Sequence, residues 1–451
     1  MTANQSSYLK VNRCSYIIEA AVEYFISLLI TDTFVSNLLL ENGLSAAHTG
    51  IIIQLASFAF IAQLFSAFYR KKGKMKTFVT VMHLANQLLF AFLYMVPGIN
   101  IPQSLKITLI VSMFLVGHII ANIISPYKLS WLMSFVDDSS RGKFTANKEI
   151  VSLLTGTIFQ LVMANRVDHY MKAGEYTVAF NLCAITILVL AAIHFICLIV
   201  IKDGIVVNKE ARIEEEKTGV FGIIKEIAVN KAYLKVLLAV IIWHIVTGVS
   251  VSFFGAYKLK TLEFTITGSI VLACVSAVTR AVVSRKFGKY ADRNSWAKLL
   301  YICFFIVSIA FLANVFVLSG QTSFNIGSYS LVIDHNKLMF IAYSVIHGIS
   351  MAGINGGLMN IMFDYVPHSR RSAALGISNS VGGIISFLAA LVGGWVLASI
   401  QKGDDKAMLS FDVLGIGFGM YGQQVLSLIS FVVCIVLIIY MKTIVLKISK
   451  K

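Results

Sequence analysis

The chain has 451 residues, of which 57% are hydrophobic and 13% charged, and its formal net charge is +16. A soluble protein of this length could not bury so large an apolar fraction, so its solvent is expected to be lipid. A transmembrane β-barrel is excluded as well, because apolar runs such as residues 431–439 do not alternate between apolar and polar side chains.

The apolar runs predict twelve membrane-spanning helices, most of about 20 residues or more, enough to cross ~30 Å of hydrocarbon. In chain order they cover residues 15–40, 47–69, 77–97, 107–133, 146–165, 178–201, 235–256, 265–284, 299–318, 338–362, 373–399 and 421–441. The expected fold class is an all-α polytopic membrane protein. We expect a six-helix bundle over 1–201, a cytoplasmic linker with an amphipathic helix over 202–234, and a second six-helix bundle over 235–451. The loops 319–337 and 400–420 are polar and are assigned no chemistry.

The basic residues predict the orientation of these helices. If the N-terminus is cytoplasmic, 28 of the 38 Lys and Arg residues lie on the cytoplasmic side and 8 on the opposite side. Cytoplasmic loops carry such an excess, so both termini are expected to face the cytoplasm from an inner or plasma membrane. The positive charge then reflects topology, and nucleic acid is not an expected partner.

Two short basic stretches, residues 65–76 and 287–298, align without a gap at an offset of 222. A second correspondence, at an offset of 229, relates Arg141 to Arg370 and His118 to His347. The repeat predicts two pseudo-symmetric halves, the plan of a secondary transporter.

These features resemble the major facilitator superfamily over essentially the whole chain. Gly288, Asp292 and Arg293 match the superfamily's G-x-x-x-D-R signature, whereas the first copy has Ser66 and Arg70 in place of the Gly and the Asp. The resemblance implies alternating access between two six-helix halves and a cytoplasmic gate built on these loops. The expected gate residues are Arg70, Lys71, Arg141, Gly288, Asp292, Arg293 and Arg370.

The first span contains three acids, which are costly in hydrocarbon and therefore usually face a cavity or a partner. Glu19 and Glu23 are four residues apart and share one helix face, while Asp32 lies on the opposite face unless the helix bends. In the functional interpretation, Glu23 or Asp32 binds a proton or pairs with substrate or a cationic side chain. In the structural alternative, the acids pair with Lys10, Arg13 or a neighbouring span.

The fourth span presents a polar stripe near its middle. His118, Asn122 and Ser125 follow the i, i+4, i+7 spacing of one face and suit a polar solute, while Lys128 is expected to extend to the cytoplasmic interface. Spans 3 and 6 are peripheral in the resembled fold, so His83, Asn86, Gln87 and His194 are not expected to contribute. The remaining substrate or proton-binding candidates are His244, Thr247, Arg280, His347, Asn355 and Asn379.

The expected function is secondary active transport of a small polar solute, such as a sugar or glycoside, coupled to protons as a symport. A sodium-coupled or uniport mechanism stays open, as does export of amphipathic compounds. A non-transporting sensor or a membrane enzyme is the alternative of another class, but no P-loop, zincin or nucleophile-elbow motif is present. We expect no enzyme activity, no catalytic residues, no cofactor and no metal site. The expected partners are the solute, protons and lipid, bound by a monomer.

Overall fold

The computed structural model describes residues 3–64, 75–133, 135–136, 141–202, 225–227, 229–316, 321–326, 329–367, 370–413 and 416–449. Within these residues, 12 helices are long and apolar enough to cross a membrane, and they confirm the twelve predicted spans. The chain forms two compact units. Unit 1 comprises residues 1–43 and 58–222, and unit 2 comprises residues 44–57 and 223–451.

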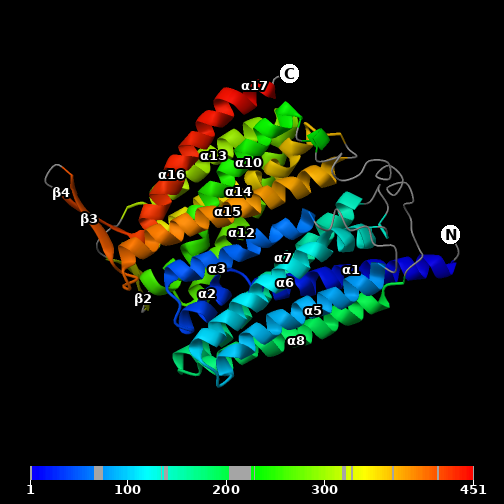
Figure 1. Cartoon of the computed structure of the whole chain (residues 1–451), viewed down its shortest axis with the longest axis horizontal. Coiled ribbons are helices and arrows are strands. Elements are labelled where there is room, and N and C mark those ends of the chain that lie inside the picture. Colours follow the sequence, from blue (N-terminus) through cyan, green and yellow to red (C-terminus); the bar gives the residue numbers. More distant parts are fainter. Residues whose placement is uncertain are drawn as a thin grey trace. The chain divides into compact units, whose positions relative to one another are not determined.

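Unit 1 is a helical bundle in which α1 packs against α7 and α8, and α5 packs against α6 and α8 (Figure 1). Its elements are α1 (Ala3–Leu29), α2 (Asp32–Glu41), η1 (Ala59–Ile61), α5 (Met75–Met95), η2 (Val96–Gly98), α6 (Gln103–Met133), α7 (Arg141–Lys172) and α8 (Tyr176–Val200). Helix α6 continues through Pro126 without interruption. Lys76 at the start of α5 donates hydrogen bonds of 2.6 Å to the carbonyls of Ile199 and Ile201, and so satisfies the C-terminal end of α8.

Unit 2 is a second helical bundle in which α10 packs against α15 and α16, and α14 packs against α12 and α13. Its helices are α3 (Ala46–Phe58, which belongs to this unit up to Ser57), α10 (Lys231–Ser250), η6 (Val251–Phe253), α11 (Phe254–Ala256), η7 (Tyr257–Thr261), α12 (Ile266–Arg293), α13 (Trp296–Ala313), α14 (His335–Phe363), α15 (Arg371–Gln401), α16 (Gly422–Tyr440), η9 (Met441–Val445) and α17 (Leu446–Ile448). Helix α3 is tied to α15 by Gln54, which donates a hydrogen bond of 2.6 Å to Ser386 Oγ. The domain boundaries at residues 201 and 235 stay a prediction, as does the amphipathic linker helix, most of which lies outside the described residues.

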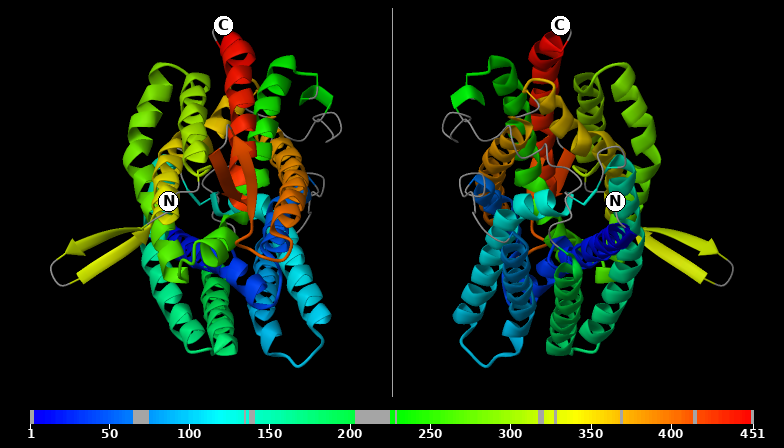
Figure 2. Two further views of the ribbon diagram at one scale, coloured as in Figure 1. Left: turned by 90° about the vertical axis from the view of Figure 1, so that its left-hand side faces the viewer. Right: turned by 90° about the vertical axis from the view of Figure 1, so that its right-hand side faces the viewer.

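Two β-hairpins lie in the polar loops to which the sequence assigned no chemistry. Strands β1 (Gln321–Ile326) and β2 (Tyr329–Asp334) pair antiparallel, as do β3 (Met408–Val413) and β4 (Ile416–Tyr421). The hairpin β1–β2 extends away from the helices of its unit (Figure 2). Each strand has only six residues. Such short strands give a weak signal in a sequence dominated by long apolar runs.

The first span is broken within the membrane segment. Helix α1 ends at Leu29 and α2 begins at Asp32, whose φ of +36° is unusual for a residue other than glycine. Adding the repeat offset of 222 to residues 29–31 gives residues 251–253, which form the short 3₁₀ helix η6 that interrupts the seventh span. The two spans therefore depart from regular α-helix at equivalent positions of the repeat.

Gly248 allows a close approach between α10 and α15. A Cβ atom at this position would lie 2.4 Å from the backbone oxygen of Ser386, which cannot move without the helix. We therefore expect Gly248→Ala to destabilise unit 2 by about 1–3 kcal/mol, the usual cost of overpacking, and to lower its thermal midpoint in detergent. The matched control is Gly376→Ala on α15, where an added Cβ meets nothing within 4 Å. Equal midpoints for the two variants would contradict this role.

Candidate functional site

Unit 1 contains a charged cluster of five side chains at the junction of four helices, which we call the acid–histidine cluster. Glu19 and Glu23 come from α1, Lys128 from α6, His83 from α5 and His194 from α8. Glu19 is fully buried, Lys128 is 8% exposed, and the side chain of Glu23 is 41% exposed. Lys128 Nζ bonds to both carboxylates, to Glu19 Oε1 and Glu23 Oε2. A single ammonium therefore holds two acids that the sequence placed on one helix face.

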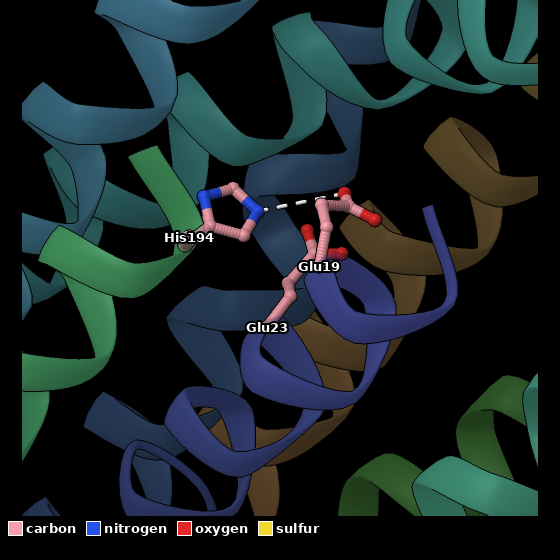
Figure 3. Close-up of side chains that lie close together, drawn as sticks. All are labelled: Glu19, Glu23 and His194. Carbon is pink, nitrogen blue, oxygen red and sulfur yellow. Dashed lines mark ion pairs between the residues drawn. The ribbon is translucent and has the colours of Figure 1, made fainter. Parts of the chain in front are cut away.

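Two histidines also lie close to these carboxylates. His194 Nε2 lies 3.4 Å from Glu19 Oε1 (Figure 3) and His83 Nε2 lies 3.7 Å from Glu23 Oε1. The imidazole rings are 5.0 Å apart between centroids. His83 is 3% exposed and His194 is 1% exposed, so both are buried to the same extent as the hydrophobic core residues. The arrangement encloses two acids between one cation and two imidazoles.

The structure corrects two expectations here. Lys128 does not extend to the interface, because its attraction to two carboxylates in a dry environment outweighs the gain from hydrating the ammonium. His83 and His194, which were discounted as peripheral, face inward to the acids. Helix α8 packs on α1, and α5 packs on α8. A polar side chain inside the membrane usually faces a polar or charged partner, here the two carboxylates. The signal that could have found them was the presence of a titratable histidine inside each of these two predicted spans.

The polar stripe of α6 is divided between two environments. Asn122 accepts a hydrogen bond of 2.9 Å from Gln63 Nε2 and donates one of 2.9 Å to the carbonyl of His118. The His118 ring instead lies between the aromatic rings of Phe90 and Phe114, at centroid distances of 5.1 and 4.5 Å. Ser125 is exposed. Gln63 and Asn122, which we call the amide pair, are the part of the stripe that presents hydrogen-bonding groups together.

Asp32 is exposed at the break in the first span. It is the first residue of α2, and the next residue, Thr33, donates a hydrogen bond of 3.4 Å to Asp32 Oδ2. The interruption between α1 and α2 means that Asp32 does not continue the regular helix that carries Glu19 and Glu23. Asp32 is not among the residues of the acid–histidine cluster.

The candidates of unit 2 are distributed over several helices. The His244 ring lies over Gly382 of α15, where an added Cβ would be 2.3 Å from Nε2. The His347 ring stacks on Tyr343 at 5.2 Å, and Arg280 is close enough to interact with it electrostatically. Of the other candidates in unit 2, Thr247 and Asn379 are half-buried and Asn355 is exposed. Their roles stay predictions.

The predicted gate residues fall into three groups. Arg70 and Lys71 lie outside the described residues, and Arg141 begins α7 with a side chain that is not described. Gly288, Asp292 and Arg293 form the last turns of α12 rather than a loop, because the helix continues to Arg293. Arg370 Nε donates a hydrogen bond of 3.0 Å to Glu226 Oε2 in the segment that precedes α10. A gating role for these residues stays a prediction.

No protein-family model matches the sequence, and no curated protein matches it. Solved structures do match over almost the whole chain. A mutant of the nucleoside transporter NupG superposes with a TM-score of 0.70 at 12% identity, covering 96% of this chain and 99% of that one. The D-xylose–proton symporter gives 0.67 at 10% identity, with 97% and 98% covered.

A bacterial homologue of the human lysosomal transporter Spinster, in an inward-facing and unoccupied conformation, gives a TM-score of 0.67 at 12% identity, with 98% and 97% covered. The 12 apolar helices of the described residues indicate a multi-pass membrane protein. The chain therefore shares its fold with these solved transporters, as the resemblance read from the sequence implied.

Proposed function

We propose that this protein is a secondary active transporter that moves a small polar solute, of the sugar or glycoside kind, by alternating access between its two halves and in symport with protons. The observation that carries the proposal is the twelve-helix transporter fold, shared over at least 96% of the chain with a nucleoside transporter and a D-xylose–proton symporter. We place it as a monomer in the inner or plasma membrane, with both termini in the cytoplasm and no nucleic-acid partner.

The amide pair supports a polar solute. Gln63 and Asn122 bring two carboxamide groups together at 2.9 Å on unit 1, and each carboxamide carries both donor and acceptor groups. Sugar hydroxyls are both donors and acceptors, so they complement such groups. We assign the amide pair a role in binding the solute.

Asp32 supports proton coupling. Glu19 and Glu23 are both paired with Lys128, which leaves the functional interpretation of the first span to the third acid. Asp32 is exposed at a break in the span, where a carboxylate can be hydrated in one state and enclosed in another. Because enclosure away from water favours the protonated form of a carboxyl group, a cycle that opens and closes around Asp32 would carry a proton.

Removing the amide pair tests the solute site. We expect the double variant Gln63→Leu/Asn122→Leu to lower kcat/KM for uptake into proteoliposomes by about 10- to 100-fold, because lost hydrogen bonds to a polar solute cost about 1–3 kcal/mol. Its stability should change little, since both partners are replaced together. The control is Thr108→Val on the same helix, where the hydroxyl bonds only the Ser104 carbonyl among the hydrogen bonds seen. Uptake at the rate of the unmodified protein in the double variant would refute the assignment.

A further inference from the structure

We propose that the acid–histidine cluster is a binding site for a divalent first-row transition-metal ion such as Zn²⁺ or Co²⁺, with Glu19, Glu23 and His194 as ligands and His83 beside them. One ligand atom from each of Glu19, Glu23 and His194 lies within 4.8 Å of the other two. A tetrahedral ion with bonds of about 2.0–2.2 Å holds its ligand atoms about 3.3–3.6 Å apart, so the donors would have to move closer together by an ångström or so. Small side-chain rotations would bring all three donors to one ion.

The histidines provide an observation that does not depend on the acids. Both ring nitrogens of His83 and Nε2 of His194 have no hydrogen-bond partner among the described residues, although both side chains are at least 97% buried. Gln87 lies one turn from His83 on α5, and its amide oxygen and nitrogen are also buried without a hydrogen-bond partner among the described residues. Buried polar atoms normally have partners, so two imidazoles aimed at a pair of carboxylates without hydrogen bonds indicate that a ligand completes the site.

The donor set selects the kind of ion. Imidazole nitrogen with carboxylate oxygen suits zinc, cobalt, iron and manganese. Calcium and magnesium prefer oxygen ligands alone, and copper(I) prefers sulfur, which none of the cluster's side chains offers. The site is therefore expected to discriminate against Mg²⁺ and Ca²⁺.

Lys128 occupies the position that the ion would take. The ammonium is a single positive charge facing two carboxylates, whereas a divalent ion matches the charge of two carboxylates by itself. The ammonium sits on a flexible four-carbon stem that can turn away, so Lys128 and the metal ion compete for the same oxygens. The lysine thus keeps the acids paired when metal is absent, and it weakens the site for the metal.

This site is distinct from the amide pair and from Asp32, and it goes beyond the proposed function. It also departs from the sequence-based expectation that the protein has no metal site. Short sequence motifs such as the zincin motif do not report ligands that come from two helices far apart in the sequence.

The experiment is a Co²⁺ titration of the full-length, tag-free protein in detergent, read by the visible d–d absorption of bound cobalt. We expect saturable binding of one ion, displaced by Zn²⁺ but not by Mg²⁺ or Ca²⁺. Glu19→Gln, Glu23→Gln and His194→Ala should each weaken binding by at least about 10-fold, the scale on which even an outer-shell partner acts. His48→Ala is the matched control, because this histidine on α3 already bonds Ser45 at 2.8 Å. This variant should bind Co²⁺ with the affinity of the unmodified protein.

Lys128→Met provides the second arm. Removing the competing ammonium should raise the Co²⁺ affinity by about 10-fold or more, and Zn²⁺ should raise the thermal midpoint of this variant more than that of the unmodified protein. If Lys128→Met does not fold, the Co²⁺ titrations of the unmodified protein and of the three ligand variants still test the metal site. No cobalt spectrum in the unmodified protein, or a spectrum that survives in all three ligand variants, would overturn the proposal. Neither outcome involves solute uptake, so the proposed transport function would stand.

Discussion

Lys128→Met is expected to destabilise unit 1 by about 3–5 kcal/mol, the cost of leaving a buried charge without its partner. Its ammonium bonds both Glu19 and Glu23, and Glu19 is fully buried with its side chain inside the bundle. Most of the loss should arise at Glu19, because the side chain of Glu23 is 41% exposed and water can replace part of what it loses. The measurement is the midpoint of thermal unfolding in detergent without added divalent metal.

The control for this prediction is a compensating substitution. Lys128→Met/Glu19→Gln removes the buried acid together with the lysine, so it should recover most of the lost stability. Glu263→Gln is the matched surface variant, since Glu263 pairs with Lys406 on an exposed loop, and it should change the midpoint little. If Lys128→Met alone melts at the same temperature as the unmodified protein, the cluster does not stabilise the bundle.

Asp32→Asn is expected to abolish uphill accumulation while leaving downhill movement of the solute. At one proton per solute, a gradient of one pH unit stores about 1.4 kcal/mol and can support a tenfold solute ratio. An asparagine keeps the size and polarity of the side chain but cannot take up the proton. In proteoliposomes with such a gradient, the solute ratio of the variant should therefore fall from up to about tenfold to about one, while solute counterflow continues.

Glu41→Gln, at the other end of α2, is the control for Asp32→Asn. It removes an exposed acid from the same helix and should keep the accumulation ratio of the unmodified protein. If Asp32→Asn still accumulates the solute fully, a residue other than Asp32 binds the coupling proton. Loss of both accumulation and counterflow would show instead that Asp32 is needed for the solute itself.

The fold could be predicted because membrane insertion leaves a strong and local signal. Every span shows as an apolar run, and lipid forces each run to satisfy its own backbone as a helix. The hairpins β1–β2 and β3–β4 were missed because six-residue strands outside the membrane carry no comparable signal. The helical form of the Gly288–Arg293 signature was missed for a related reason: polar residues mark the end of the apolar run, while the helix continues past it.

The site was predicted only in part, because burial depends on partners far away in the sequence. The spacing of Glu19 and Glu23 correctly placed both acids on one face, and one stated alternative, pairing with a cationic side chain, is confirmed by Lys128. The sequence could not show that Lys128, 105 residues from Glu23, turns inward. His83 and His194 were excluded by an argument from helix position alone, which ignores that a peripheral helix still has an inward face.

The most direct test of the account is to follow lumenal pH and solute together in proteoliposomes that carry the unmodified protein, using a panel of sugars, glycosides and other neutral polar solutes. We expect at least one such solute, added outside in the absence of a pH gradient, to enter and to acidify the lumen as protons enter with it, and Asp32→Asn to remove the pH change. Solute entry with no proton movement would contradict proton coupling, and failure of every solute to move, with intact binding, would contradict transport.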